Sequence, residues 1–172
     1  MRQLFLGSIF ILILLAGCSQ DDRSSWFETK EKAIEHGLEK ENVDQSAVLS
    51  VEEYQGETFV FFVRAGGLGV ASLTESKKGY RWFRGEPYFG FDVDDAFKNI
   101  PYTTNGFTSE TKTGLEYSVL YGQVFDHSIQ RLKLLGAGEE RDLEIFGDSK
   151  FFFAIHQQPF SSLEIVPIRN DS

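Results

Sequence analysis

The spacing of apolar residues changes along the chain, and the first part has helical spacing. Phe27, Ile34 and Leu38 lie at i, i+7 and i+11 and therefore share one face of a helix of about four turns. Ser25 and Glu28 have the spacing of a capping box, in which each side chain bonds the other residue's backbone N–H. We therefore expect an amphipathic helix that begins at Ser25.

From residue 47 the apolar period becomes two, which predicts antiparallel strands. Gln55–Gly56 is a two-residue hairpin loop between the first two strands. The strand after it is apolar on both faces, so we expect it to lie in the centre of a sheet covered on both sides. The four predicted strands of this part are 47–54, 57–65, 68–75 and 80–84.

Residues 96–113 interrupt this pattern, because Pro, Asn, Gly and Thr residues separate weak apolar positions. We interpret them as a long loop or an interdomain linker. Short strands separated by turn residues follow, a pattern typical of a small sandwich or barrel. The five predicted strands are 116–125, 128–135, 142–146, 151–156 and 163–168.

The predicted fold class is α+β. An N-terminal amphipathic helix packs on an antiparallel β meander in residues 25–95, and a small all-β sandwich- or barrel-like module follows in residues 114–172. The linker 96–113 separates these two modules.

The N-terminus has the pattern of a secretory signal peptide. Arg2 provides a positive start, and the apolar run 4–16 follows it. A membrane-spanning helix needs about 20 apolar residues, so this run is too short to span a bilayer. We expect residues 1–17 to be a signal peptide and residues 18–24 to be a short tether.

Leu15-Ala16-Gly17-Cys18, at the end of this run, resembles the lipobox of bacterial lipoproteins. The resemblance implies that the chain is cut between Gly17 and Cys18 and that the Cys18 thiol carries a lipid. It also implies an extracytoplasmic location on a bacterial cell membrane. The body of the chain is similar to short, uncharacterised lipoproteins of Bacillus-type bacteria.

Composition narrows the possible partners. The 26 acidic and 17 basic residues give a net charge of −9, which argues against binding to nucleic acid. Removal of residues 1–17 takes away Arg2 and no acid, so the charge becomes −10, and an acidic surface is repelled by anionic lipids. Cys18 is the only cysteine, which leaves no thiol for a disulfide or a zinc site. The 17 phenylalanines must then stabilise the fold by packing.

The candidate metal-binding and catalytic residues do not form a known motif. Asp92, Asp94 and Asp95 lie close together, but the segment lacks the Gly and distal Glu of a calcium loop. No Gly-x-Ser-x-Gly motif occurs. We therefore predict no metal, no cofactor and no enzymatic activity. The three histidines have no ligand-type spacing: His36, His127 and His156.

One aromatic and basic segment is a candidate binding surface. It contains Tyr80, Arg81, Trp82, Arg84 and Tyr88. Exposed aromatic residues beside arginine often dominate binding interfaces. Residues of these types more often form the core and edge of a small β protein, and the sequence favours that interpretation for this segment as well. The sequence does not decide whether the segment is buried or exposed, and it remains the best candidate for a functional surface.

These observations favour a lipid-anchored extracytoplasmic protein with a non-catalytic binding role, whose partner is an unknown envelope protein or ligand. One alternative is an inhibitor of an extracytoplasmic enzyme, since a helix followed by a meander is loosely similar to PepSY-type inhibitory modules. A second alternative is a small envelope hydrolase, which would combine Asp92, Asp94 or Asp95 with His127 or His156.

Overall fold

The structure is a computed structural model that describes residues 25–91, 100–136 and 138–169. The described residues form one α-helix, ten β-strands and two short 3-10 turns. In chain order these elements are α1 (Lys30–Lys40), η1 (Gln45–Ala47), β1 (Val48–Tyr54), β2 (Glu57–Arg64), β3 (Gly67–Ser76), β4 (Gly79–Phe83), β5 (Tyr102–Glu110), β6 (Glu116–Val124), β7 (Ile129–Leu135), β8 (Arg141–Leu143), β9 (Phe151–His156), η3 (Phe160–Ser162) and β10 (Glu164–Arg169).

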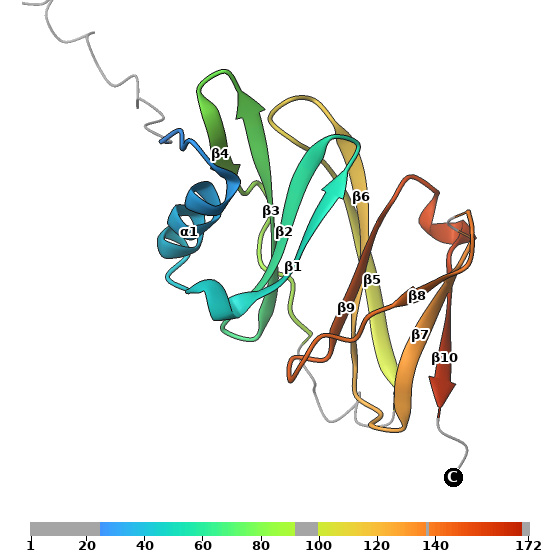
Figure 1. Cartoon of the computed structure of the whole chain (residues 1–172). Coiled ribbons are helices and arrows are strands. Elements are labelled where there is room, and N and C mark those ends of the chain that lie inside the picture. The colour runs from blue at the N-terminus through green and yellow to red at the C-terminus, as the bar shows by residue number, and fades with distance from the viewer. Residues whose placement is uncertain (1–24, 92–99, 137, 170–172) are drawn as a thin grey trace, which may run out of the picture.

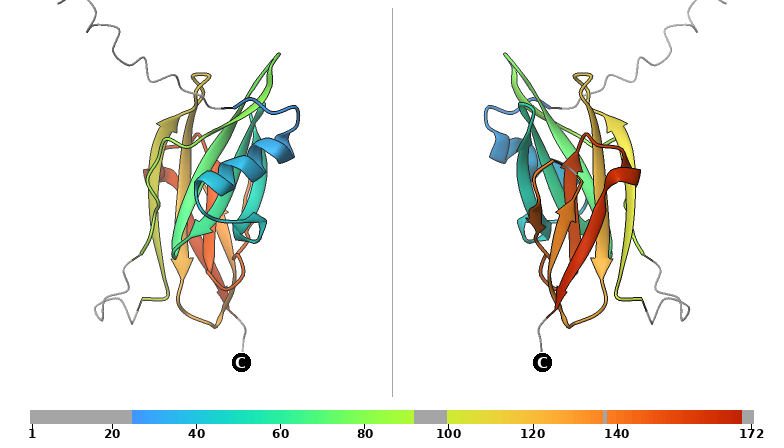
Figure 2. Two further views of the ribbon diagram at one scale, coloured as in Figure 1. Left: turned by 90° about the vertical axis from the view of Figure 1, so that its left-hand side faces the viewer. Right: turned by 90° about the vertical axis from the view of Figure 1, so that its right-hand side faces the viewer.

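The strands form three antiparallel sheets that are stacked as layers, seen from left to right in Figure 1. Sheet A has the strand order β1-β2-β3-β4, sheet B the order β5-β6-β9, and sheet C the order β10-β7-β8. Sheet B lies between sheets A and C, and α1 crosses the outer face of sheet A (Figure 2). The described chain is therefore built in four layers, one helical and three of β-sheet.

Alternation along β2 places phenylalanines on both faces of sheet A. Phe59 and Phe61 face sheet B, where the Phe61 ring stacks on that of Phe153 with centroids 3.9 Å apart. Val60 and Phe62 face α1. Burial of one such side chain contributes about 1.5–3 kcal/mol, so these phenylalanines hold adjacent layers together. The prediction of a doubly covered central strand here is confirmed.

Sheet B is also covered on both faces, and β9 shows this most clearly. All six of its residues are buried. Phe153 and Ile155 pack toward sheet A, whereas Phe152 and Ala154 pack toward sheet C. The apolar cluster between sheets A and B thus combines side chains from residues 59–70 with side chains from residues 117–155.

The helix begins later than the sequence predicts. Thr29 is its N-cap, and the Thr29 side chain accepts a hydrogen bond from the Lys32 backbone N–H at 3.3 Å. Phe27 instead pairs with β4: its N–H donates to the Tyr80 carbonyl at 2.8 Å, and the Tyr80 N–H donates to the Phe27 carbonyl at 2.7 Å. The start at Ser25 is therefore wrong, because a strand-like pairing takes the place of the first helical turn.

The predicted fold class is wrong as well. The expected architecture was an N-terminal amphipathic helix on a meander, followed by a small all-β module, in an α+β protein. The described residues are instead mainly β, with three antiparallel sheets and one helix of 11 residues. Within the described ranges, no helix is long and apolar enough to cross a membrane.

The range 96–113, expected to be a loop or linker, contains strand β5. Its pairing with β6 runs without interruption from Tyr102–Val124 to Glu110–Glu116. The strand has few apolar residues because only part of it is buried. The hairpin at Gln55–Gly56, by contrast, is confirmed, and both residues have the positive φ that a tight two-residue loop requires (50° and 84°).

Candidate functional site

The structure places Tyr80 and Trp82, two residues of the predicted binding surface, beneath α1. Both side chains pack against the cluster between α1 and sheet A. The Trp82 indole lies so close to Gly37 that a Cβ at position 37 would overlap the ring. Its Nε1 atom is buried and has no hydrogen bond of normal geometry. Trp82 therefore fixes the helix to the sheet.

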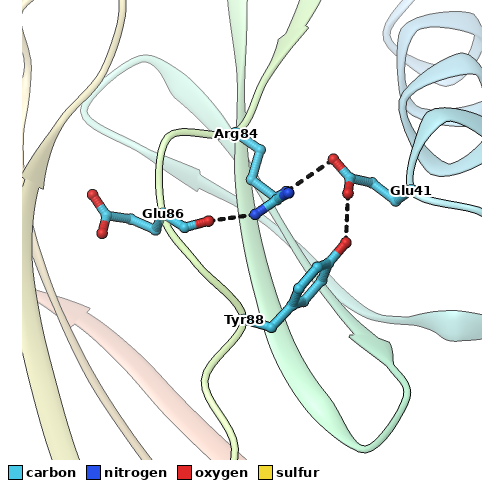
Figure 3. Close-up of polar contacts among 4 residues, drawn as sticks. All are labelled: Glu41, Arg84, Glu86 and Tyr88. Atoms are coloured by element: carbon cyan, nitrogen blue, oxygen red, sulfur yellow. Dashed lines mark hydrogen bonds and ion pairs between the residues drawn. The ribbon is translucent and has the colours of Figure 1, made fainter.

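Arg84 and Tyr88, two further residues of that surface, converge on Glu41 at the C-terminal end of α1 (Figure 3). Arg84 Nε donates to Glu41 Oε1 at 2.8 Å, and the Tyr88 hydroxyl donates to Glu41 Oε2 at 2.5 Å. The Arg84 guanidinium also donates to the Glu86 carbonyl and lies over the Tyr88 ring, 4.5 Å from its centroid. The carboxylate is thus held by two side chains from the segment that follows β4.

The negative charge of Glu41 is balanced by the positive charge of Arg84. Burial raises the pKa of Glu41, but the hydrogen bonds from Arg84 and Tyr88 outweigh burial and hold that pKa below its ordinary value. Burial, followed by the hydrogen bond to Glu41, raises the pKa of Tyr88. Glu41 therefore stays ionised and Tyr88 stays protonated at neutral pH. This arrangement is that of a structural ion pair.

Two further contacts of the predicted surface run to α1 and to the residues just before it. Lys30 Nζ lies 5.8 Å from the centroid of the Tyr80 ring. The Arg81 guanidinium lies 4.8 Å from the centroid of the Trp26 ring, which stands just before α1. The five residues thus form a seam along α1 and its approach, and they do not converge on one cavity.

The histidines of the hydrolase hypothesis lie far apart. His156 pairs with Ser118 near the start of β6, whereas His127 lies beyond the end of that strand. His127, together with Asp126 and Lys150, lines a pocket of about 390 Å³. Gly17 and Cys18, like Asp92, Asp94 and Asp95, lie outside the described residues.

His156 is nearly inaccessible, with 4% of its surface exposed. Its Nδ1 atom is 2.8 Å from the Gln158 carbonyl, and its Nε2 atom is buried with no hydrogen-bond partner. Burial lowers the pKa of this imidazole, so it is neutral at pH 7. His36, on α1, lies 3.6 Å from the Glu39 carboxylate. In the described part of the chain, no three His, Cys, Asp or Glu residues are placed to hold a metal ion.

A pocket of about 440 Å³ opens between the edge of sheet B and the edge of sheet C, and we call it the β5 groove. Its walls are β5 on one side and the η3–β10 segment on the other. The Tyr102 hydroxyl donates to the Ile165 carbonyl at 3.1 Å and so joins the two walls. The other lining residues carry no charge: Thr104, Asn105, Gly106, Leu120, Phe160 and Leu163.

Phe160 is the prominent side chain of this groove. It is 37% exposed and is, with Val51, one of two large apolar residues that the described structure leaves exposed. Its ring lies against Gly106, where a Cβ would overlap it. Phe160 was not among the predicted site residues, because Gln157–Gln158–Pro159 indicated only a turn. The available signal was an aromatic residue placed just after that turn.

No family model, no curated protein and no solved structure matches the chain. The β5 groove and the Leu15-Ala16-Gly17-Cys18 motif are therefore the two features from which a function can be inferred.

Proposed function

We propose that this protein is a lipid-anchored, non-catalytic interaction protein on the extracytoplasmic face of a bacterial cell membrane. The observation that carries the proposal is Leu15-Ala16-Gly17-Cys18, which stands at the end of an apolar run that is too short to span a bilayer. Two acyl chains on Cys18 would anchor the chain stably, whereas a single chain binds only marginally.

The β5 groove supports the binding part of the proposal. It is open, it has no charged lining residue, and it contains one of the two exposed large apolar side chains of the described structure. Exposed apolar patches rimmed by polar groups are typical of interaction sites. The partner is another component of the envelope that presents an apolar group to this groove.

The expected tether keeps the groove near the membrane but free of it. Residues 18–24 reach at most about 25 Å when fully extended. The net charge of −10 that remains after removal of residues 1–17 repels the folded part from anionic head groups. The lipid alone therefore holds the protein at the membrane, and the groove stays accessible to a partner.

The anchor is tested by fractionation of cells that express either the wild-type chain or Cys18→Ala. The wild type should remain in the membrane fraction through salt and carbonate washes, and Cys18→Ala should appear in the soluble fraction. Ser19→Ala is the matched control, because it changes the neighbouring residue and leaves the thiol intact. Equal retention of wild type and Cys18→Ala would show that the anchor assignment is wrong.

The binding role is tested by crosslinking in intact cells. A photoreactive residue at Thr104, on the groove, should give one reproducible crosslinked protein that is absent when the same residue is placed at Glu35, on the exposed face of α1. Phe160→Ser should abolish that crosslink. The same crosslinked proteins from both positions, with no effect of Phe160→Ser, would contradict an interaction through the groove.

A further inference from the structure

Exposed edge strands promote unwanted pairing, and proteins usually protect them. In sheet C, β8 has only three residues, and β10 carries Pro167 together with a register shift between Ile168 and Arg169. In sheet A, β1 has a register shift between Val48 and Ser50. These edges are short, bulged or interrupted by proline.

Two further edges are covered by other parts of the chain. β4 pairs with Phe27 through two backbone hydrogen bonds. At β9, the Arg141 guanidinium donates to the Ile155 carbonyl at 2.9 Å, and the backbone N–H of Phe146 donates to the Phe151 carbonyl. Both edges therefore have partners for some of their outward main-chain groups.

β5, the remaining edge strand of the described structure, has none of these main-chain protections. The segment after β4 contacts only its side chains, since the Ser109 hydroxyl donates to the Glu86 carboxylate and the Phe107 ring stacks on that of Phe89. It has nine residues in unbroken register with β6. From Tyr102 to Ser109 it contains no proline and no charged side chain. An edge of this kind is a ready template for another strand.

Side-chain and turn hydrogen bonds show which main-chain groups of β5 point outward. The Gly106 N–H donates to the Asn105 side chain at 2.8 Å, whereas the Thr111 N–H donates to the Leu115 carbonyl within the β5–β6 hairpin at 3.0 Å. Because antiparallel strands alternate these directions, the N–H groups of Thr104 and Thr108 also point away from β6. The Asn105 side chain covers only the central donor.

The groove determines what kind of strand fits this edge. Side chains of even-numbered β5 residues face sheet C, as Tyr102 does. An added strand would place alternate side chains over the same pocket of about 440 Å³. A second copy of β5, paired antiparallel about Gly106, would place Gly106, Thr108 and Glu110 opposite this pocket, and none of these is a large apolar residue. The pocket therefore fits a segment with a larger apolar side chain than this symmetric pairing supplies.

We propose that the β5 groove binds an extended, uncharged segment of a partner protein, which pairs with β5 as a fourth strand of sheet B and places one large apolar side chain against Phe160 and Leu120. Main-chain hydrogen bonds would supply affinity and the pocket would supply selectivity, as in other cases of strand addition. The inference deepens the proposed function by naming the class of partner. It does not depend on the lipid anchor.

The test is selection of a displayed library of random nine-residue peptides on the purified full chain. Selected peptides should be poor in charged residues and should share an aromatic or large aliphatic position. Amide hydrogen exchange, resolved by residue, should slow at Thr104 and Thr108 when a selected peptide binds. The selection uses the purified chain without a membrane. A failure to enrich peptides would therefore contradict strand addition, and it would leave the assignment of the lipid anchor untouched.

Two pairs of variants separate strand addition from nonspecific adhesion. Thr104→Pro removes an outward N–H without removing a β5–β6 hydrogen bond, and it should weaken peptide binding about tenfold. Thr104→Ala shortens the same side chain but keeps the N–H, so it should weaken binding clearly less than Thr104→Pro does. Phe160→Ser should also weaken binding about tenfold, whereas Val51→Ser removes the other exposed apolar side chain and should have no effect.

Three results would overturn the inference. The first is a selection that enriches no peptide above the empty support. The second is a selected peptide that binds wild type and Thr104→Pro equally. The third is a concentration-dependent dimer, seen by analytical ultracentrifugation and abolished by Thr104→Pro, because it would show that a second copy of this chain occupies the edge.

Discussion

Gly37→Ala tests the contact between α1 and Trp82. In an open helix position alanine is more favourable than glycine by about 0.8–1 kcal/mol. Here the new methyl group would overlap the Trp82 ring, which is itself confined by Phe62 at a centroid distance of 5.6 Å. Overpacking of this kind costs about 1–3 kcal/mol, so after the gain in helix propensity is subtracted the variant should be less stable by up to about 2 kcal/mol. The melting temperature should fall by about 4 °C.

The assay is urea unfolding of the full chain, followed by circular dichroism. Glu35→Ala, on the exposed face of the same helix, is the matched control and should change stability by less than about 0.5 kcal/mol. Trp82→Leu in the Gly37→Ala background should cost less than the sum of the two single changes, with a coupling of about 0.5–3 kcal/mol. A Gly37→Ala variant more stable than the wild type would refute the placement of Trp82 under the helix.

Further predictions concern pH dependence and the core. Burial lowers the folded-state pKa of His156, so below pH 6.5 the unfolded chain binds more protons than the folded chain. The free energy of unfolding should therefore be unaffected by this residue above pH 6.5 and decrease as the pH falls below that value. His156→Phe should flatten this dependence between pH 8 and pH 5.5 in urea titrations, and an unchanged slope would contradict the assignment. Glu41 has a folded pKa below 4.5, so its contribution is present above that pH and is lost in acid. Glu41→Gln should lower the free energy of unfolding by about 1–2 kcal/mol at pH 7, because the contact with Arg84 is lost, and by less near pH 3. An equal loss at the two pH values would argue against an ionised pair. Phe61→Ala should lower the free energy of unfolding, measured by calorimetry, by about 3–5 kcal/mol. Val51→Ala, at an exposed position, should lower it by less than about 0.5 kcal/mol. Similar losses for the two variants would contradict the packing between sheets A and B.

Local patterns in the sequence predicted most strands of the described fold. The turn at Gln55–Gly56 and the alternation from Phe59 to Phe62 are sufficient to define β1 and β2, because both signals are short-range. β5 was missed for a physical reason. Its edge position leaves little of it buried, and the Asn105–Gly106 pair at its centre is typical of a turn.

The arrangement of the layers and the site could not be predicted from local spacing. Glu41 and Tyr88 are 47 residues apart in sequence and meet only because α1 lies across sheet A. Phe160 reaches Gly106 only because sheets B and C place their edges side by side. The sequence indicated an aromatic and basic segment, but long-range packing determined that these residues fasten α1 and that the open groove lies elsewhere.

The most direct test of the proposed function is intact mass spectrometry of the full-length gene product extracted from bacterial membranes. We expect a chain that begins at Cys18 and carries a diacylglyceryl group on its thiol, with residues 1–17 absent. A chain that retains residues 1–17, or one whose Cys18 is unmodified, would contradict the assignment of this protein as a lipid-anchored component of the envelope.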